Sequence, residues 1–168
     1  MPELLADEGE PVDFAALGLV ALRALRRRAQ RDEADLSYVR RLVQGRIDIL
    51  RAELARRTGR DAPLVERLPE ILTDQPARQR SSARHVTLGT PQSEEYGRLA
   101  AGVLAQVSLS ALDSLGDDEL RAAMSHLVRC EHQVSRRRHQ LQSAADGCSA
   151  EIARRYREGE AQVDDLLA

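Results

Sequence analysis

Aromatic side chains are scarce in this sequence. Its 168 residues include no tryptophan, one phenylalanine and three tyrosines. Alanine, leucine, arginine and glutamate dominate, and charged residues make up 31% of the chain. This mixture favours long helices that meet along narrow aliphatic seams. We therefore expect an all-α fold, and the length suits a single domain with a core of its own.

Cysteine is equally rare, with only Cys130 and Cys148 present. The two residues form no C-x-x-C motif and have no neighbouring set of metal ligands, so we expect no metal site. We interpret both as small apolar residues in a reducing cytosol. The acidic N-terminus lacks an apolar signal core, and no run is long enough to cross a membrane, so we expect a cytoplasmic protein.

Positive charge is not in excess, because the formal net charge is −2. General binding to duplex DNA or to an anionic membrane needs a basic surface, so neither is expected. Catalytic motifs are also missing: the sequence has no nucleophile elbow, no P-loop and no H-E-x-x-H. We therefore predict a protein that is not an enzyme and has no catalytic residues.

One polar pattern, E-x3-S-x2-R-x3-Q-x3-D, occurs twice. The first copy is Glu33, Ser37, Arg40, Gln44 and Asp48, and the second is Glu131, Ser135, Arg138, Gln142 and Asp146. Each residue of the second copy lies 98 positions after its counterpart, and A-E-[LI]-A-R-R follows in both copies, at 52–57 and 150–155. On a helical wheel the five positions lie within a stripe of about 80°. We call each row a polar ladder.

The rest of the chain is arranged around these two segments. We expect a disordered tail at 1–12, a short helix or leader at 13–28, and long helices at about 32–58 and 117–157, the first with Asp32 as its N-cap and Gly59 as its stop. In the insert at 59–116 we expect short helical turns at 61–76, a mobile loop at 74–92 and a helix that begins at Thr90-Pro91.

An aliphatic seam runs beside each ladder. In the first long helix the apolar residues step by three or four positions: Leu36, Val39, Val43, Ile47, Leu50 and Leu54. The second has Val134, Leu141, Ala145, Cys148 and Ile152 at equivalent positions, and only Arg137, opposite Val39, breaks the match. Such a seam is typical of a coiled coil. We predict an antiparallel coiled-coil hairpin of the two long helices, with the shorter helices of the insert packed alongside.

If the two seams meet, ten polar side chains share one surface, and a pseudo-two-fold axis relates the two ladders. A ligand with two-fold symmetry would then meet the same groups twice. Arginine suits the O6 and N7 acceptors of guanine, and aspartate accepts from its N1 and N2 donors. A single polar stripe beside a seam is usually solvated, with ion pairs that add a few tenths of a kcal/mol each. The duplication of all five positions favours a ligand instead.

The doubled motif and the stretch at 31–57 resemble the RsiG family of actinobacterial, Streptomyces-type anti-sigma factors. The resemblance covers both long helices and implies the two-motif, single-chain form of the family. It implies that the ten ladder residues bind cyclic di-GMP, as two molecules with intercalated bases, and that the loaded protein binds the FliA-like sporulation sigma factor WhiG one to one. Transcription of late differentiation genes would be blocked until cyclic di-GMP falls.

Within the ladders, we expect Arg40, Arg138, Asp48 and Asp146 to read guanine. Two alternatives stay open at this point. The chain is either a non-enzymatic helical adaptor whose ladders are solvated, or a cyclic di-GMP receptor that acts on a different partner. Calorimetry with cyclic di-GMP, with and without the sigma factor, distinguishes the three.

Overall fold

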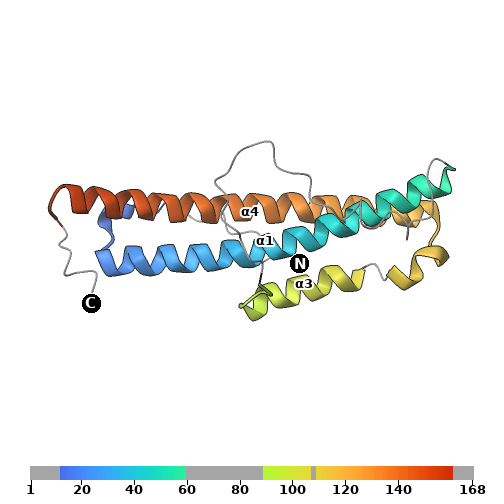
Figure 1. The fold of residues 1–168 in the computed structure, drawn as a ribbon, viewed down its shortest axis with the longest axis horizontal. Coiled ribbons are helices and arrows are strands. Elements are labelled where there is room, and N and C mark those ends of the chain that lie inside the picture. The colour runs from blue at the N-terminus through green and yellow to red at the C-terminus, as the bar shows by residue number, and fades with distance from the viewer. Residues whose placement is uncertain (1–11, 60–88, 107–108, 161–168) are drawn as a thin grey trace.

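Two long antiparallel helices form the molecule (Figure 1). The computed structural model describes residues 12–59, 89–106 and 109–160. Helix α1 spans Leu19–Arg57 and helix α4 spans Asp117–Arg157. A shorter helix, α3, spans Glu94–Gln106, and the 3-10 helices η2 (Phe14–Ala16) and η3 (Leu109–Ser114) precede the two long helices. The described residues contain no strand, which confirms the all-α prediction for that part of the chain.

The start of α1 was predicted wrongly. The helix begins at Leu19, capped by the extended backbone of Gly18, thirteen residues before the expected start at Asp32. Residues 19–32 contain no proline or glycine, and they are rich in Ala, Leu and Arg, which carry high helix propensity. Asp32 instead pairs with Arg28 at 3.7 Å within the helix. A good N-cap residue does not begin a helix when the residues before it also favour helix.

The other ends of the long helices follow their sequence signals. Gly59 lies just past Arg57 with a φ of +72°, the left-handed conformation that glycine adopts most easily. Helix α4 has three acidic residues in its first turn, and Glu119 Oε2 accepts a hydrogen bond of 2.7 Å from the Gly116 amide. Helix α1 therefore ends, and helix α4 begins, where the sequence indicated.

The predicted seams meet between α1 and α4. Leu36, Val39, Val43 and Val134 are fully buried, and a single core cluster contains them. The equivalent residues Ala145, Cys148 and Ile152 are buried farther along α4. Together with Leu22, Phe14 and Tyr156, the last two form a second cluster at the other end of the pair. The hairpin is thus closed by aliphatic contacts along its length.

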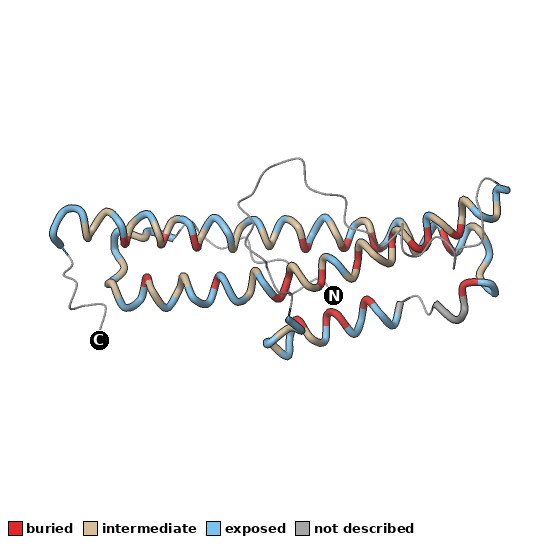
Figure 2. The backbone as a smooth tube through the Cα atoms, in the orientation of Figure 1, coloured by how far each residue is buried: buried red, intermediate tan, exposed pale blue. Residues whose placement is uncertain are grey.

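Helix α3 covers only one half of this pair, beside the C-terminal half of α1 (Figure 1). Its buried residues are Tyr96, Leu99, Ala100 and Val103. Buried positions are accordingly denser on that half of the molecule (Figure 2). The helix begins at Glu94 and not at Thr90-Pro91 as predicted, because Asp35 of α1 accepts the amides of Gln92 and Ser93 and fixes the entry of the chain there.

Several predictions lie outside the described residues. These are the N-terminal tail up to residue 11, the short turns at 61–76 and most of the loop at 74–92.

Candidate functional site

The centre of the two ladders is an interlocked set of side chains from both long helices. Glu33 Oε1 accepts a hydrogen bond of 3.0 Å from Ser37 Oγ, one turn along α1. The same oxygen accepts one of 3.1 Å from Arg138 Nη1 of α4. The first ladder is therefore in contact with the second.

The reciprocal set has the same form. Glu131 Oε1 accepts from Ser135 Oγ at 2.8 Å, one turn along α4, and from Arg40 Nε of α1 at 3.0 Å. Arg40 Nε is also 3.0 Å from Ser135 Oγ, and Gln44 Nε2 is 3.5 Å from the Glu131 oxygen. Glu33, Ser37 and Arg138 thus correspond to Glu131, Ser135 and Arg40.

This exchange of partners defines a pseudo-two-fold axis perpendicular to the helices. The axis passes close to Ser37 and Ser135, because the two Glu–Arg pairs flank these serines on opposite sides. An antiparallel pair of copies with equal residues at equal positions gives this symmetry. The prediction that the ladders face one shared surface is confirmed by these contacts.

The outer ladder residues lie toward the two ends of the surface. Asp48 and Asp146 are each eleven residues beyond the axis, which separates them by about 33 Å along the helices. Asp48 accepts a bond of 2.7 Å from Arg51 Nη1. Gln142 and Asp146 are exposed. Six of the ten predicted residues are therefore linked by hydrogen bonds at the centre, and Gln44 contacts this set through Glu131. The other three, Asp48, Gln142 and Asp146, lie toward the ends.

The ladder face of the hairpin is on the opposite side from α3. Asp35, which holds the start of α3, lies about 160° around α1 from Glu33. The two central arginine side chains keep about a third of their surface exposed, 35% for Arg40 and 32% for Arg138. Both side chains are therefore partly accessible to a ligand, even though each guanidinium group is paired with a carboxylate.

The charges of the two ladders limit what they bind well. Together they carry four carboxylates and two guanidinium groups. A surface with this balance has no positive excess to attract phosphate in general. It offers hydrogen-bond acceptors and donors at set distances, which suits a ligand that carries both donors and acceptors, such as the edge of a nucleobase.

Residues 8–72 and 106–168 match the model of the RsiG-like family. The chain belongs to the RsiG-like family. Both ladders, and both long helices, lie within the matched residues. A search of curated proteins finds no match.

Membership of the RsiG-like family indicates a regulator of the anti-sigma-factor type and not a known enzyme. Among the described residues, no three or more His, Cys, Asp or Glu side chains are grouped so that they could hold a metal ion. Cys130 and Cys148 are both buried free thiols, and burial raises the pKa of each. Within the same residues, no helix is long and apolar enough to span a membrane.

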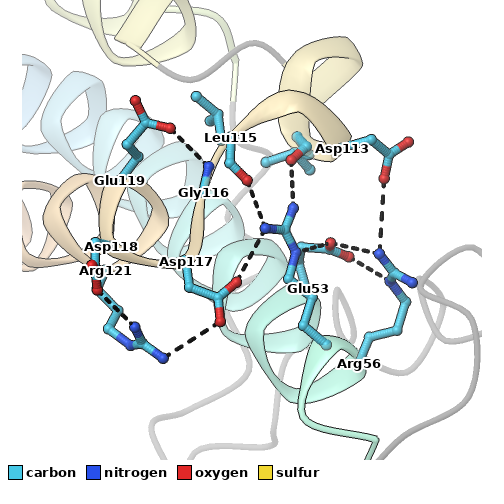
Figure 3. Close-up of polar contacts among 11 residues, drawn as sticks. Glu53, Arg56, Asp113, Leu115, Gly116, Asp117, Asp118, Glu119 and Arg121 are labelled. Atoms are coloured by element: carbon cyan, nitrogen blue, oxygen red, sulfur yellow. Dashed lines mark hydrogen bonds and ion pairs between the residues drawn. The ribbon is translucent and has the colours of Figure 1, made fainter.

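Sequence reasoning missed a second pair of duplicated clusters at the ends of the hairpin. Glu53, only 2% exposed, binds Arg56 through two hydrogen bonds of 2.8 Å and Arg57 Nε through one of 2.7 Å. Arg57 also donates to the carbonyl oxygens of Leu112 and Leu115 at the end of η3 (Figure 3). We call this group the Glu53 clamp.

The Glu53 clamp has a counterpart at the other end of the pair. Glu151 accepts from Arg154 Nε and Nη2 and from Arg155 Nε, at 2.7 to 2.9 Å. Arg155 Nη2 then donates to the carbonyls of Phe14 and Ala15 in η2. Each clamp thus ties the end of one long helix to the 3-10 helix that precedes the other.

A signal for these clamps was present in the A-E-[LI]-A-R-R repeat at 52–57 and 150–155. Leu17-Gly18 and Leu115-Gly116 are separated by the same 98 residues, so the duplication reaches the two 3-10 helices as well. The repeat was visible, but the atoms that its arginines bind were not. Asp35 had no counterpart in the sequence pattern, because its partners are backbone amides of the insert.

Proposed function

We propose that this chain binds cyclic di-GMP on the ladder face and, when loaded, sequesters a WhiG-type sigma factor. The single observation that carries the proposal is the exchange of partners between Glu33–Arg138 and Glu131–Arg40. It gives the face a pseudo-two-fold axis, and cyclic di-GMP is a ligand of two identical halves. Each half of the ligand then meets the same set of groups.

The base edges of guanine match the side chains of the ladders. Asp48 and Asp146 accept from N1–H and N2–H, and Arg40 and Arg138 donate to O6 and N7. Adenine lacks the N1–H and N2–H donors, so cyclic di-AMP would leave the aspartates without partners. A site built on such hydrogen bonds discriminates strongly against an analogue that lacks them.

Ligand binding must compete with the two Glu–Arg pairs. In the free protein Glu131 and Glu33 hold Arg40 and Arg138 at 3.0 and 3.1 Å. The pairs are partly exposed, and such pairs contribute only about 0–1 kcal/mol. Replacing these pairs by hydrogen bonds to guanine or phosphate therefore costs little free energy. In the ligand-free protein the same pairs keep both arginines oriented toward the shared surface.

The sigma factor would recognise the surface only after the dinucleotides fill it. We propose two cyclic di-GMP molecules and one sigma factor per chain. Because ligand and partner then bind the same state, each raises the affinity of the other by an equal factor. A fall in cyclic di-GMP releases the sigma factor to RNA polymerase.

Calorimetry tests both parts of the proposal. The chain is titrated with cyclic di-GMP, with cyclic di-AMP, and with WhiG in the presence and absence of cyclic di-GMP. We expect heat with cyclic di-GMP alone or together with WhiG, none with cyclic di-AMP, and tighter WhiG binding when cyclic di-GMP is present.

Two other outcomes identify the alternatives. Binding of cyclic di-GMP without any effect on WhiG binding would indicate a receptor that acts on a different partner. WhiG binding that does not depend on the dinucleotide, or no binding of either, would support a helical adaptor whose ladders only stabilise the hairpin.

A further inference from the structure

The two ends of the ladder face are not equivalent, although the motif is the same in both copies. At one end Asp48 is ion-paired with Arg51 at 2.7 Å. At the other end the position of Arg51 is taken by Ser149, whose hydroxyl donates to the Ala145 carbonyl. Asp146 is exposed and has no ion pair within the described residues. In the ligand-free protein Asp48 is therefore paired with an arginine, whereas Asp146 is available to accept hydrogen bonds from a ligand.

The helix opposite each aspartate also differs. Arg26 lies two heptads before Arg40 and on the same stripe of α1, at about 20° from Glu33. Its counterpart in α4 is Met124, which packs against the main core cluster. Gln30 continues the R-x3-Q spacing of Arg40 and Gln44, and its counterpart is Val128. The polar stripe is thus extended on α1 and apolar on α4.

The register of the hairpin places Arg26 beside Asp146. Leu22 and Cys148 pack in one cluster, and Arg23 donates to the Tyr156 hydroxyl, so this part of α1 runs along the last turns of α4. The crossed pairs Glu33–Arg138 and Arg40–Glu131 set the register of the two helices, and the same register brings Arg26 level with residues 145 and 146 of α4. Arg26 and Asp146 both project from the ladder stripes of their helices.

Arg26 lacks the partner that Arg40 has. Fourteen residues farther along α4, Ala145 stands at the position that corresponds to Glu131, so the carboxylate is missing there, whereas Ser149 keeps the serine of Ser135. The Nε atom of Arg26, like that of Arg138, is buried and has no hydrogen-bond partner among the described residues, but Arg138 has a carboxylate partner at its Nη1. A buried donor without a partner is unfavourable, so a ligand that draws the Arg26 guanidinium toward the ladder face relieves that cost.

We propose that Arg26 joins Asp146 in holding one guanine, and that the first cyclic di-GMP binds at this end of the ladder face. Asp146 accepts from the N1 and N2 donors of the base, and Arg26 donates to its O6 and N7 acceptors from the opposite helix. The inference rests on the proposed binding of cyclic di-GMP. At the Asp48 end, Met124 and Val128 offer no such donor.

Arg26→Met tests the subsite, because methionine is the residue at the equivalent position of α4 and has similar helix propensity. Cyclic di-GMP is titrated into the full chain by calorimetry, in the presence of WhiG if the sigma factor is needed for binding. We expect the affinity of the tighter step to fall about tenfold or more. Arg27→Met, at an exposed neighbouring arginine, is the matched control and should change the affinity by less than about twofold.

A second pair of variants addresses the aspartates. Asp146→Asn should weaken the tighter step more than Asp48→Asn does, and circular dichroism should show equal helicity for all four variants. If wild-type binds cyclic di-GMP and Arg26→Met behaves as Arg27→Met does, the subsite is wrong and the proposed function stands. If wild-type binds no cyclic di-GMP under either condition, the proposed function itself fails.

Discussion

At the scale of single residues, Glu53 fixes the C-terminal end of α1. Hydrogen bonds from Arg56, and then from Arg57, outweigh desolvation and lower the pKa of Glu53 from 4.5 to about 2. Arg57 in turn holds the carbonyls of η3 and is 3.2 Å from Asp117. Glu53 is buried, whereas Arg56 and Arg57 are 39% and 18% exposed.

We expect Glu53→Gln to destabilise the protein by about 1 to 3 kcal/mol at pH 7, because the arginines lose their charge-assisted hydrogen bonds to Glu53 but keep weaker pairs with Asp113 and Asp117. Urea unfolding monitored by circular dichroism measures the change. Asp113→Asn is the control, since Asp113 is 95% exposed and lies 3.9 Å from Arg56 in a surface pair. A loss below about 1 kcal/mol for Glu53→Gln would show that the clamp does not stabilise the end of the helix.

The same carboxylate makes stability depend on pH with a defined sign. Its pKa is lower in the folded protein, so its contribution is complete above about pH 4.5 and is lost as the pH falls toward 2. Wild-type should lose stability over this interval. The Glu53→Gln variant should lose less, and equal slopes in the two proteins would contradict the assignment.

Gly147 allows η2 to rest on α4. A Cβ atom at this position would lie 2.8 Å from Cζ of Phe14. Alanine has a helix propensity higher than that of glycine by about 1 kcal/mol, so Gly147→Ala favours α4 locally but displaces the Phe14 ring. We expect faster hydrogen exchange at residues 13–24 and unchanged exchange at 36–50.

Gly102→Ala is the matched control, because a Cβ atom there meets nothing within 4 Å. Protection of residues 13–24 that is the same in Gly147→Ala and wild-type would show that Phe14 does not hold η2 in place.

At the scale of elements, α3 depends on one carboxylate of another helix. The buried Asp35 accepts hydrogen bonds of 2.9 to 3.1 Å from the Gln92 and Ser93 amides, immediately before α3 begins. It therefore acts as an N-cap supplied from α1, and capping carboxylates contribute about 1 kcal/mol. The contact is on the side of α1 away from the ladders.

Asp35→Ala should loosen α3 selectively. We expect faster hydrogen exchange at 94–105 and little change in α4, as measured by mass spectrometry of proteolytic fragments. Asp113→Ala, at an exposed site, should leave α3 protected. If Asp35→Ala leaves the exchange of α3 unchanged, apolar contacts of Tyr96, Leu99 and Val103 alone hold the helix.

The elements also show where sequence reasoning succeeds. The seven-residue spacing of Leu36, Val43 and Leu50 predicts which face of α1 is buried, because a seam leaves a strong periodic signal. The start of α1 was missed because Asp32 is a good cap and residues 19–31 are good helix formers, and local preference alone does not decide between them. The start of α3 was missed because Asp35 acts over a long sequence distance.

At the scale of the whole molecule, the duplication explains both the fold and the candidate site. Matching residues at one offset predicted two related helices, and the reciprocal Glu–Arg pairs confirm that the helices face one another. The two ends differ because Arg26 and Met124, which occupy equivalent positions of the repeat, lie outside the motif. It could be recognised only once the antiparallel register was known.

Cyclic di-GMP binding by single-ladder variants tests the central claim, that the two ladders hold one ligand surface together. Wild-type, Arg40→Ala, Arg138→Ala and the exposed control Arg136→Ala are titrated by calorimetry under the conditions in which wild-type binds. We predict that Arg40→Ala and Arg138→Ala each weaken binding about tenfold or more and that Arg136→Ala stays within about twofold of wild-type. Unchanged affinity in both ladder variants, or loss of half the sites with the rest unaffected, would contradict a shared surface.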